Sequence, residues 1–207
     1  MSFRRLSEEF NRQLNENLIL YFITIFCLCI GIILGIYGVK KLTTIEKDSI
    51  VNYITVIADS YLTNGTSYKS IFYQGVKNNI FILLVCWGLG LTVVGIPIIL
   101  VLNILKGYTI GFTFSFFISK LSNKGMLLSF LGVLPQNFIY VPCIIFVSVL
   151  GIKYSFCKIK NKGYYKNMGP NSDTLKYSIT VLCCGVFAFI GILFETFISP
   201  FLIKLML

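Results

Sequence analysis

A few polar residues lie inside long apolar runs of this chain, and their side chains are the ones best placed to do chemistry. Lys106 lies within one such run, and Gln136 and Asn137 lie in the middle of another, directly after Pro135. An ammonium group and two amides are expensive to bury in hydrocarbon, so they need polar partners or a polar ligand. Two roles are open to them: they hold an interrupted helix pair together, or they form the binding site of a carrier.

The sequence does not supply the residue sets that hydrolytic enzymes use. The chain has no histidine, which excludes histidine general bases and HExxH zinc sites. The three aspartates, Asp48, Asp59 and Asp173, lie between the apolar runs, so no aspartate pair is available within a membrane. Glu195 lies near the end of the last run, which predicts a position at the outer face, too far from Lys106 to pair with it. We therefore expect no enzymatic activity, no catalytic residues, no metal site and no cofactor.

The elements that position these polar residues are expected to be membrane-spanning helices. Hydrophobic residues make up 56% of the chain and charged residues 13%, whereas soluble domains contain about 25% charged residues. The net charge is +10, and the basic residues flank the apolar runs, so the expected partner is anionic lipid and not nucleic acid. Seven cysteines, an odd number, predict free thiols instead of a disulfide framework.

The apolar runs predict an all-α, polytopic bundle of about five transmembrane helices. An amphipathic cytoplasmic arm over 1–17 precedes a single transmembrane domain over 18–203. Two of the helices are expected to be broken by proline or glycine, as Pro135 and Pro142 would do. The alternative has four spans, with one long helix over 80–105. The five predicted spans are about 18–39, 79–95, 97–119, 126–152 and 177–203.

The basic residues favour five spans with the N-terminus in the cytoplasm. This arrangement places the arm and a basic loop over 153–176 on the same side, with three arginines and six lysines between them. Short cytoplasmic loops carry the excess of Lys and Arg in membrane proteins. The loop over 40–78 then lies outside, where Asp48 or Ser49 is predicted to cap a helix.

Two sequence features predict how the spans pack. Gly31, Gly35 and Gly38 in the first span are expected to let another helix approach closely. Lys106 and Gln136 lie about 13 Å and about 15 Å into their spans at the rise of an α-helix, and these depths coincide in a core about 30 Å thick. We therefore predict a structural polar cluster near the membrane midplane, made up of Asn103, Lys106, Pro135, Gln136 and Asn137.

Three stretches of the chain carry recognisable motifs. They are Gly95 to Thr113 with Leu-Lys-Gly-x-x-x-Gly-Phe-Thr, Leu128 to Pro142 with Leu-Pro-Gln-Asn, and Glu195-Thr-Phe-Ile-Ser-Pro200. Together these stretches resemble the bacterial stage II sporulation protein M family. The wider membrane family tends to have Pro-His-Gly and a glutamate where this chain has Pro135, Gln136, Asn137 and Tyr140, so chemistry that needs that acid and imidazole is not expected here.

The resemblance implies a non-enzymatic scaffold that acts in engulfment during endospore formation. Its implied location is the mother-cell membrane at the sporulation septum. Its implied partners are the stage II sporulation proteins D and P, which cleave peptidoglycan so that the membrane can move around the forespore. Glu195 and Pro200, in the outward end of the last span, are expected contact residues for these partners. The oligomeric state is left open, and a small carrier or permease subunit is the alternative function.

Overall fold

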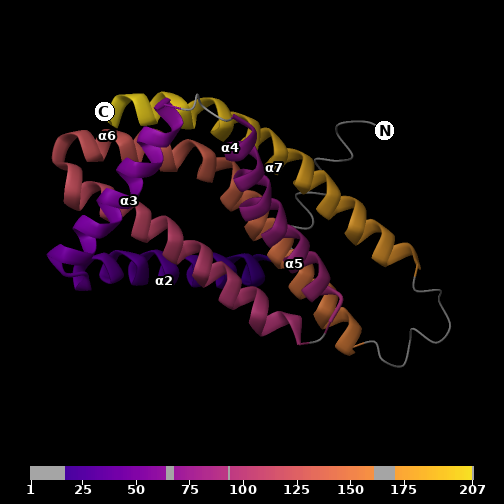
Figure 1. Cartoon of the computed structure of the whole chain (residues 1–207). Coiled ribbons are helices and arrows are strands. Elements are labelled where there is room, and N and C mark those ends of the chain that lie inside the picture. Colours follow the sequence, from indigo (N-terminus) through magenta and orange to yellow (C-terminus); the bar gives the residue numbers. More distant parts are fainter. Residues whose placement is uncertain (1–16, 64–67, 93, 161–170, 207) are drawn as a thin grey trace.

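The fold of the chain is all-α in the computed structural model, which describes residues 17–63, 68–92, 94–160 and 171–206 (Figure 1). Among these residues, three helices are long and apolar enough to cross a membrane, and a shorter apolar helix covers Tyr177–Leu193. The predicted all-α membrane bundle is therefore confirmed, while most of the arm over 1–17 lies outside the described residues. The helices are α2 (Leu18–Lys41), α3 (Thr44–Thr63), α4 (Tyr68–Gly75), the π-helix η1 (Val76–Ile80), α5 (Phe81–Gly90), α6 (Gly95–Lys160) and α7 (Asn171–Met206).

Helix α6 folds back on itself and forms two antiparallel limbs (Figure 1). We call residues 95–119 the first limb and residues 135–158 the second limb. The helix continues through Pro135 and Pro142, so the predicted break at these prolines is wrong, and the chain reverses between the limbs instead. A proline removes one backbone donor, and a helix packed against neighbours accommodates this loss without unwinding.

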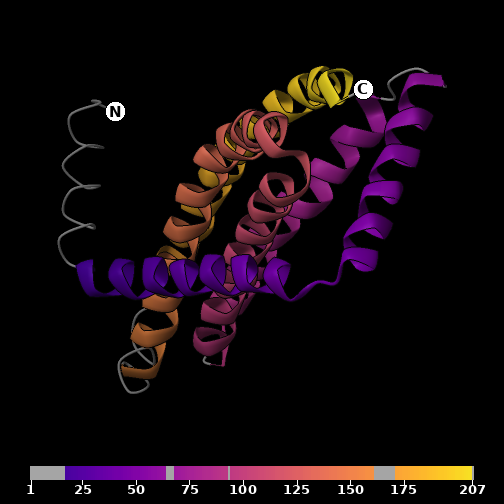
Figure 2. The same ribbon diagram turned by 90° about the vertical axis from the view of Figure 1, so that its left-hand side faces the viewer.

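Four helical passages lie side by side and alternate in direction. They are α4 to α5, the two limbs of α6, and α7, while α2 crosses the first limb obliquely (Figures 1 and 2). The glycine-rich stretch after α5 does interrupt the chain, because α5 ends at Gly90 and α6 begins at Gly95. The boundaries of five spans and their orientation in the membrane stay predictions.

Two pairs of glycines bring α2 and the first limb into backbone contact. Gly31 and Gly35 on α2 and Gly107 and Gly111 on α6 are all buried. A Cβ added at Gly31 would overlap the carbonyl oxygen of Ile104, and the other three glycines meet backbone atoms of the facing helix in the same way. The four-residue spacing puts each pair on one helix face. The predicted close approach at Gly31 and Gly35 is therefore confirmed, and the facing helix is α6.

An apolar cluster lies between α5, the second limb and α7, and its member Tyr140 also lines the polar site described below. Ser155 on the second limb lies with its Oγ 2.8 Å from the carbonyl oxygen of Gly90, and the Tyr177 hydroxyl donates to the carbonyl of Trp87 at 3.2 Å. The last carbonyls of a helix have no donor within it, so these side chains satisfy the end of α5. The buried residues of the cluster are Leu83, Cys86, Tyr140, Ile144, Val147, Tyr177, Val181, Ala188 and Ile192.

Helix α3 begins with a capping box. The backbone N–H of Thr43 donates to Oε2 of Glu46 at 2.8 Å, and the N–H of Glu46 donates to Oγ1 of Thr43 at 3.4 Å. The prediction that Asp48 or Ser49 caps this helix is wrong, since the helix begins at Thr44 and the capping residue is Thr43. A threonine followed three residues later by a glutamate satisfies two orphan N–H groups reciprocally, which explains why the helix begins at Thr44.

The start of α3 is expected to lose this cap in acid. The hydrogen bonds from Thr43 hold the pKa of the Glu46 carboxyl below its usual value. Because the folded pKa is lowered, the stabilisation is present above the unfolded value of about 4.3, and it is lost as the pH falls through the lowered pKa. An NMR titration of the Thr43 amide from about pH 7 to about pH 3 should show a midpoint below that of free glutamate.

The control for this titration is Glu46→Gln. Glutamine keeps the reciprocal hydrogen bonds of the capping box but carries no proton that titrates in this range. The variant is expected to keep the Thr43 amide signal constant over the whole titration. A midpoint at or above about 4.3 in the unmodified chain would contradict the assignment of this cap.

Candidate functional site

A polar cavity of about 230 Å³ lies between η1, the two limbs of α6 and α7. Its walls come from four segments that are distant in sequence, and they carry one ammonium group, one carboxylate and several amides and hydroxyls. Polar groups gathered in this way inside an apolar bundle mark a site in membrane proteins. The lining residues are Asn78, Asn79, Lys106, Thr109, Ile110, Thr113, Gln136, Asn137, Tyr140 and Glu195.

The ammonium group of Lys106 is held by an amide of η1. Its Nζ donates to Oδ1 of Asn79 at 2.9 Å. Asn79 is only 6% exposed, and its Nδ2 donates to the carbonyl oxygen of Gly75 at 3.3 Å. Because this backbone bond orients the amide, the oxygen of Asn79 faces the lysine. A single π-helical turn such as η1 is frequent at functional sites.

The carboxylate of Glu195 is held by a buried tyrosine on the opposite wall. The hydroxyl of Tyr140 donates to Oε2 of Glu195 at 2.9 Å, and the Tyr140 ring centre lies 5.6 Å from Nζ of Lys106, within the range of a cation–π contact. Tyr140 therefore contacts both charged groups, Lys106 through its ring face and Glu195 through its hydroxyl.

The sequence predicted Glu195 near the outer face and a poor partner for Lys106, whereas in the structure both residues line this cavity. That prediction assumed that every span begins at one membrane level and runs parallel to the others. Helix α7 instead continues to Met206 and leans across the bundle (Figure 1). Its later residues therefore reach the level of the lysine.

The cavity brings together three residues of the predicted midplane cluster, which are Lys106, Gln136 and Asn137. Pro135 directly precedes Gln136 within the helix and does not line the cavity. The structural role assigned to the cluster stays a prediction. Pro200, predicted as a contact residue, belongs to α7, and its side chain lies outside the described residues.

Asn103, the remaining member of the predicted cluster, lies outside the cavity. It is completely buried, and its Nδ2 donates to the carbonyl of Ile99 at 2.8 Å and to Oγ of Ser148 at 2.9 Å. Its Oδ1 has no hydrogen-bond partner in the described part of the chain. Asn103 therefore ties the two limbs of α6 together one turn away from Lys106.

Asn79 and Tyr140 are site residues that the sequence did not single out. Asn79 is the first residue of a predicted span, where a polar side chain is ordinary. Tyr140 follows Gln136 by four residues and so shares its helix face, but tyrosine is common here, with 12 in the chain. The available signals for Tyr140 were the face shared with Gln136 and its position where the wider membrane family tends to have a glutamate.

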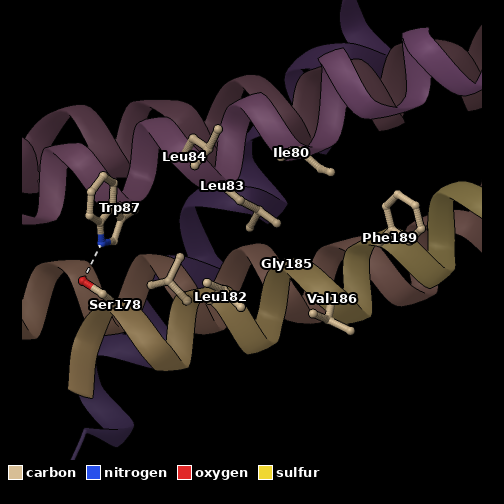
Figure 3. Close-up of a pocket in the computed structure, with 10 residues that line it drawn as sticks. Ile80, Leu83, Leu84, Trp87, Ser178, Leu182, Gly185, Val186 and Phe189 are labelled. Atoms are coloured by element: carbon tan, nitrogen blue, oxygen red, sulfur yellow. Dashed lines mark hydrogen bonds between the residues drawn. The ribbon is translucent and has the colours of Figure 1, made fainter. Parts of the chain in front are cut away.

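A second cavity, of about 500 Å³, is an apolar groove between α5 and α7 (Figure 3). At one end the indole N–H of Trp87 donates to Oγ of Ser178 at 3.2 Å. Leu182 on its rim is 68% exposed, and a Cβ added at Gly185 meets nothing within 4 Å. This groove suits apolar groups and carries none of the charged chemistry of the polar cavity.

The lining of the polar cavity consists of one ammonium group, one carboxylate, amides, hydroxyls and one apolar side chain. No three His, Cys, Asp or Glu side chains among the described residues are grouped to hold a metal ion, and all seven cysteines, which lie within those residues, are free thiols. The cavity is built to hold a polar group through hydrogen bonds and charge.

The chain was compared with known families and structures. The family model of stage II sporulation protein M matches residues 24–200. This range runs from α2 to α7 and includes every residue that lines the polar cavity. No curated protein and no solved structure matches the chain.

Proposed function

Because the chain belongs to the stage II sporulation protein M family, it is a sporulation protein of the membrane, and we propose that it is a non-enzymatic scaffold for engulfment. In this role it sits in the mother-cell membrane at the sporulation septum. There it recruits and anchors the peptidoglycan hydrolases, the stage II sporulation proteins D and P. The family match over residues 24–200 is the observation that carries this proposal.

The exposed surface of α3 is the part of the chain best suited to hold such a partner. Helix α3 lies in the segment predicted to be outside the membrane, where hydrolase domains work. Its Ile45, Tyr53 and Val56 are 77%, 68% and 66% exposed. Large apolar side chains on a solvated helix are typical of protein contact surfaces. Glu195 is less suited than α3, because it is engaged with Tyr140 inside the bundle.

Deletion of this protein is expected to leave the hydrolases made but dispersed. In sporulating cells, a fluorescently tagged hydrolase should no longer concentrate at the asymmetric septum, and engulfment should stop just after that septum forms. The physical reason is that an anchored enzyme acts at high local concentration, whereas an unanchored one diffuses away. Fluorescence at the septum, counted per cell, is the measurement.

A surface variant separates partner contact from loss of the whole protein. Tyr53→Ser with Val56→Ser should disperse the hydrolase while the scaffold still reaches the membrane, and Asn52→Ser, on the same exposed helix, should not. If the hydrolase concentrates and engulfment finishes without this protein, the scaffold function is refuted and the carrier alternative is favoured.

A further inference from the structure

A third cavity, of about 560 Å³, adjoins the polar one and forms a groove between the η1–α5 segment and the first limb of α6. The two ends of this groove differ in chemistry, and each helix contributes to both ends. The polar end is formed by Lys77, Asn78, Lys106 and Thr109. The apolar end is formed by Phe81, Ile82, Leu102 and Leu105.

This separation follows from the antiparallel course of the two helices, which are joined by the short turn after α5 (Figure 1). The step from Lys77 to Phe81 and the step from Lys106 back to Leu102 are each four residues, so each pair lies on one helix face. Because the helices run in opposite directions, both steps lead toward the same end of the groove. The groove is therefore amphipathic along its length.

The groove is open to the surroundings of the bundle. Phe81 and Leu105 at its apolar end are 63% and 53% exposed, and Lys77 at its polar end is exposed. In a membrane-spanning bundle, exposed apolar walls face acyl chains. Lys77 lies directly before the span predicted to begin at residue 79. Lys106 reaches the same level, since its Nζ contacts Asn79 and a long lysine side chain extends toward the membrane surface.

The charges at the polar end are incompletely balanced. Lys77 and Lys106 together carry two positive charges, and Glu195, which shares the adjoining cavity with Lys106, carries one negative charge. One further negative charge would make the site neutral. An ammonium group has three donors, and in the described part of the chain one hydrogen bond of Lys106 goes to Asn79, so donors remain for an anionic group.

We propose that this groove binds an anionic phospholipid. Its phosphate lies between Lys77 and Lys106, and one acyl chain lies along the apolar end of the groove. A phosphodiester supplies the single missing negative charge, and the apolar walls distinguish a lipid from a free phosphate. A phosphocholine lipid is disfavoured, because its quaternary ammonium group would lie close to two lysines.

The test uses the purified full-length chain in an uncharged detergent. Its melting temperature is measured with added phosphatidylglycerol, with phosphatidylcholine, and with glycerol 3-phosphate, which carries the phosphate without acyl chains. A ligand that binds only the folded state raises the melting temperature. We expect a clear rise with phosphatidylglycerol, a much smaller one with phosphatidylcholine, and none with glycerol 3-phosphate.

Variants locate the site within the groove. Lys77→Gln should weaken binding of phosphatidylglycerol by about fivefold, the effect of removing one lysine beside an anionic lipid. Lys77→Arg should retain binding, and Lys69→Gln, an exposed lysine of α4 outside the groove, is the matched control. Lys106→Gln should remove the preference for phosphatidylglycerol over phosphatidylcholine. If that variant does not fold, the two changes at Lys77 decide the matter.

Three results would overturn the proposal. One is equal stabilisation by the anionic and the zwitterionic lipid, which would show that the charges do not select the ligand. Another is stabilisation by glycerol 3-phosphate as strong as that by the lipid, which would identify a free phosphate as the ligand. The last is an equal loss of affinity in Lys69→Gln and Lys77→Gln, which would show that only the general surface charge matters.

Discussion

Replacing Gly35 with leucine is expected to force α2 away from α6 and to destabilise the bundle strongly. The position has no room for a side chain, since a Cβ there would lie 2.6 Å from the backbone nitrogen of Phe112 and would overlap the carbonyl oxygen of Tyr108. Both atoms belong to a helix backbone, which cannot rotate away as a side chain does. Overpacking at close contacts costs about 1–3 kcal/mol and occasionally more, and a leucine exceeds what a small shift accommodates.

Gly185→Leu is the matched control because it adds the same side chain to a glycine in another span. A Cβ at Gly185 meets nothing within 4 Å, and the residue lines the apolar groove between α5 and α7. Leucine has a higher helix propensity than glycine by somewhat less than about 1 kcal/mol, so this variant should be neutral or slightly stabilised. Thermal unfolding in detergent, followed by circular dichroism, compares the two. Equal melting temperatures would contradict the glycine interface.

The glycines of α2 show how far the sequence predicts packing in this fold. The spacing of Gly31 and Gly35 predicted a close helix contact without identifying the facing helix. Gly107 and Gly111 have the same spacing. Their segment was interpreted through its family resemblance, so they were not predicted to form the facing surface. Small residues at four-residue spacing predict that two backbones meet, while the choice of partner depends on how the whole chain is arranged.

The sequence predicted some helix boundaries correctly and misplaced others. The apolar runs predicted an all-α membrane bundle, which is confirmed, and the glycine-rich stretch before Gly95 does separate two helices. The break expected at Pro135 was wrong, since one missing donor is tolerated within a packed helix. The start of α3 was also misplaced, because the capping pair of Thr43 and Glu46 begins the helix before Asp48.

The candidate site was predictable in three of its α6 residues, Lys106, Gln136 and Asn137, and not in the others. Lys106 and Gln136 lie on spans joined by a short connection, so counting the rise along two adjacent helices placed them at similar depth. Glu195 and Asn79 come from helices whose tilt and depth in the membrane cannot be determined from the sequence. Their contribution depends on how α7 leans and on the π-helical turn η1, and both result from tertiary packing.

Replacing Asn79 with leucine is expected to be the most destabilising single change in the polar cavity. The variant removes the acceptor of the Lys106 ammonium group and leaves a charged donor in a site of low dielectric constant. An unsatisfied buried donor costs about 1–3 kcal/mol, and more when it is charged. Asn78→Leu, at the neighbouring exposed position, should have a much smaller effect on the melting temperature in detergent.

Combining Asn79→Leu with Lys106→Met tests whether the loss arises from the unpaired charge. Replacement of both partners by apolar groups of similar shape is often close to neutral, because no donor is then left without an acceptor. The double variant should therefore be more stable than Asn79→Leu alone, although it carries one more substitution. Tyr140, the hydrogen-bond donor to Glu195, is unchanged in every variant, and Lys106→Met alone completes the double-mutant cycle. Additive losses in the double variant would show that Asn79 stabilises the bundle by packing and not by holding Lys106.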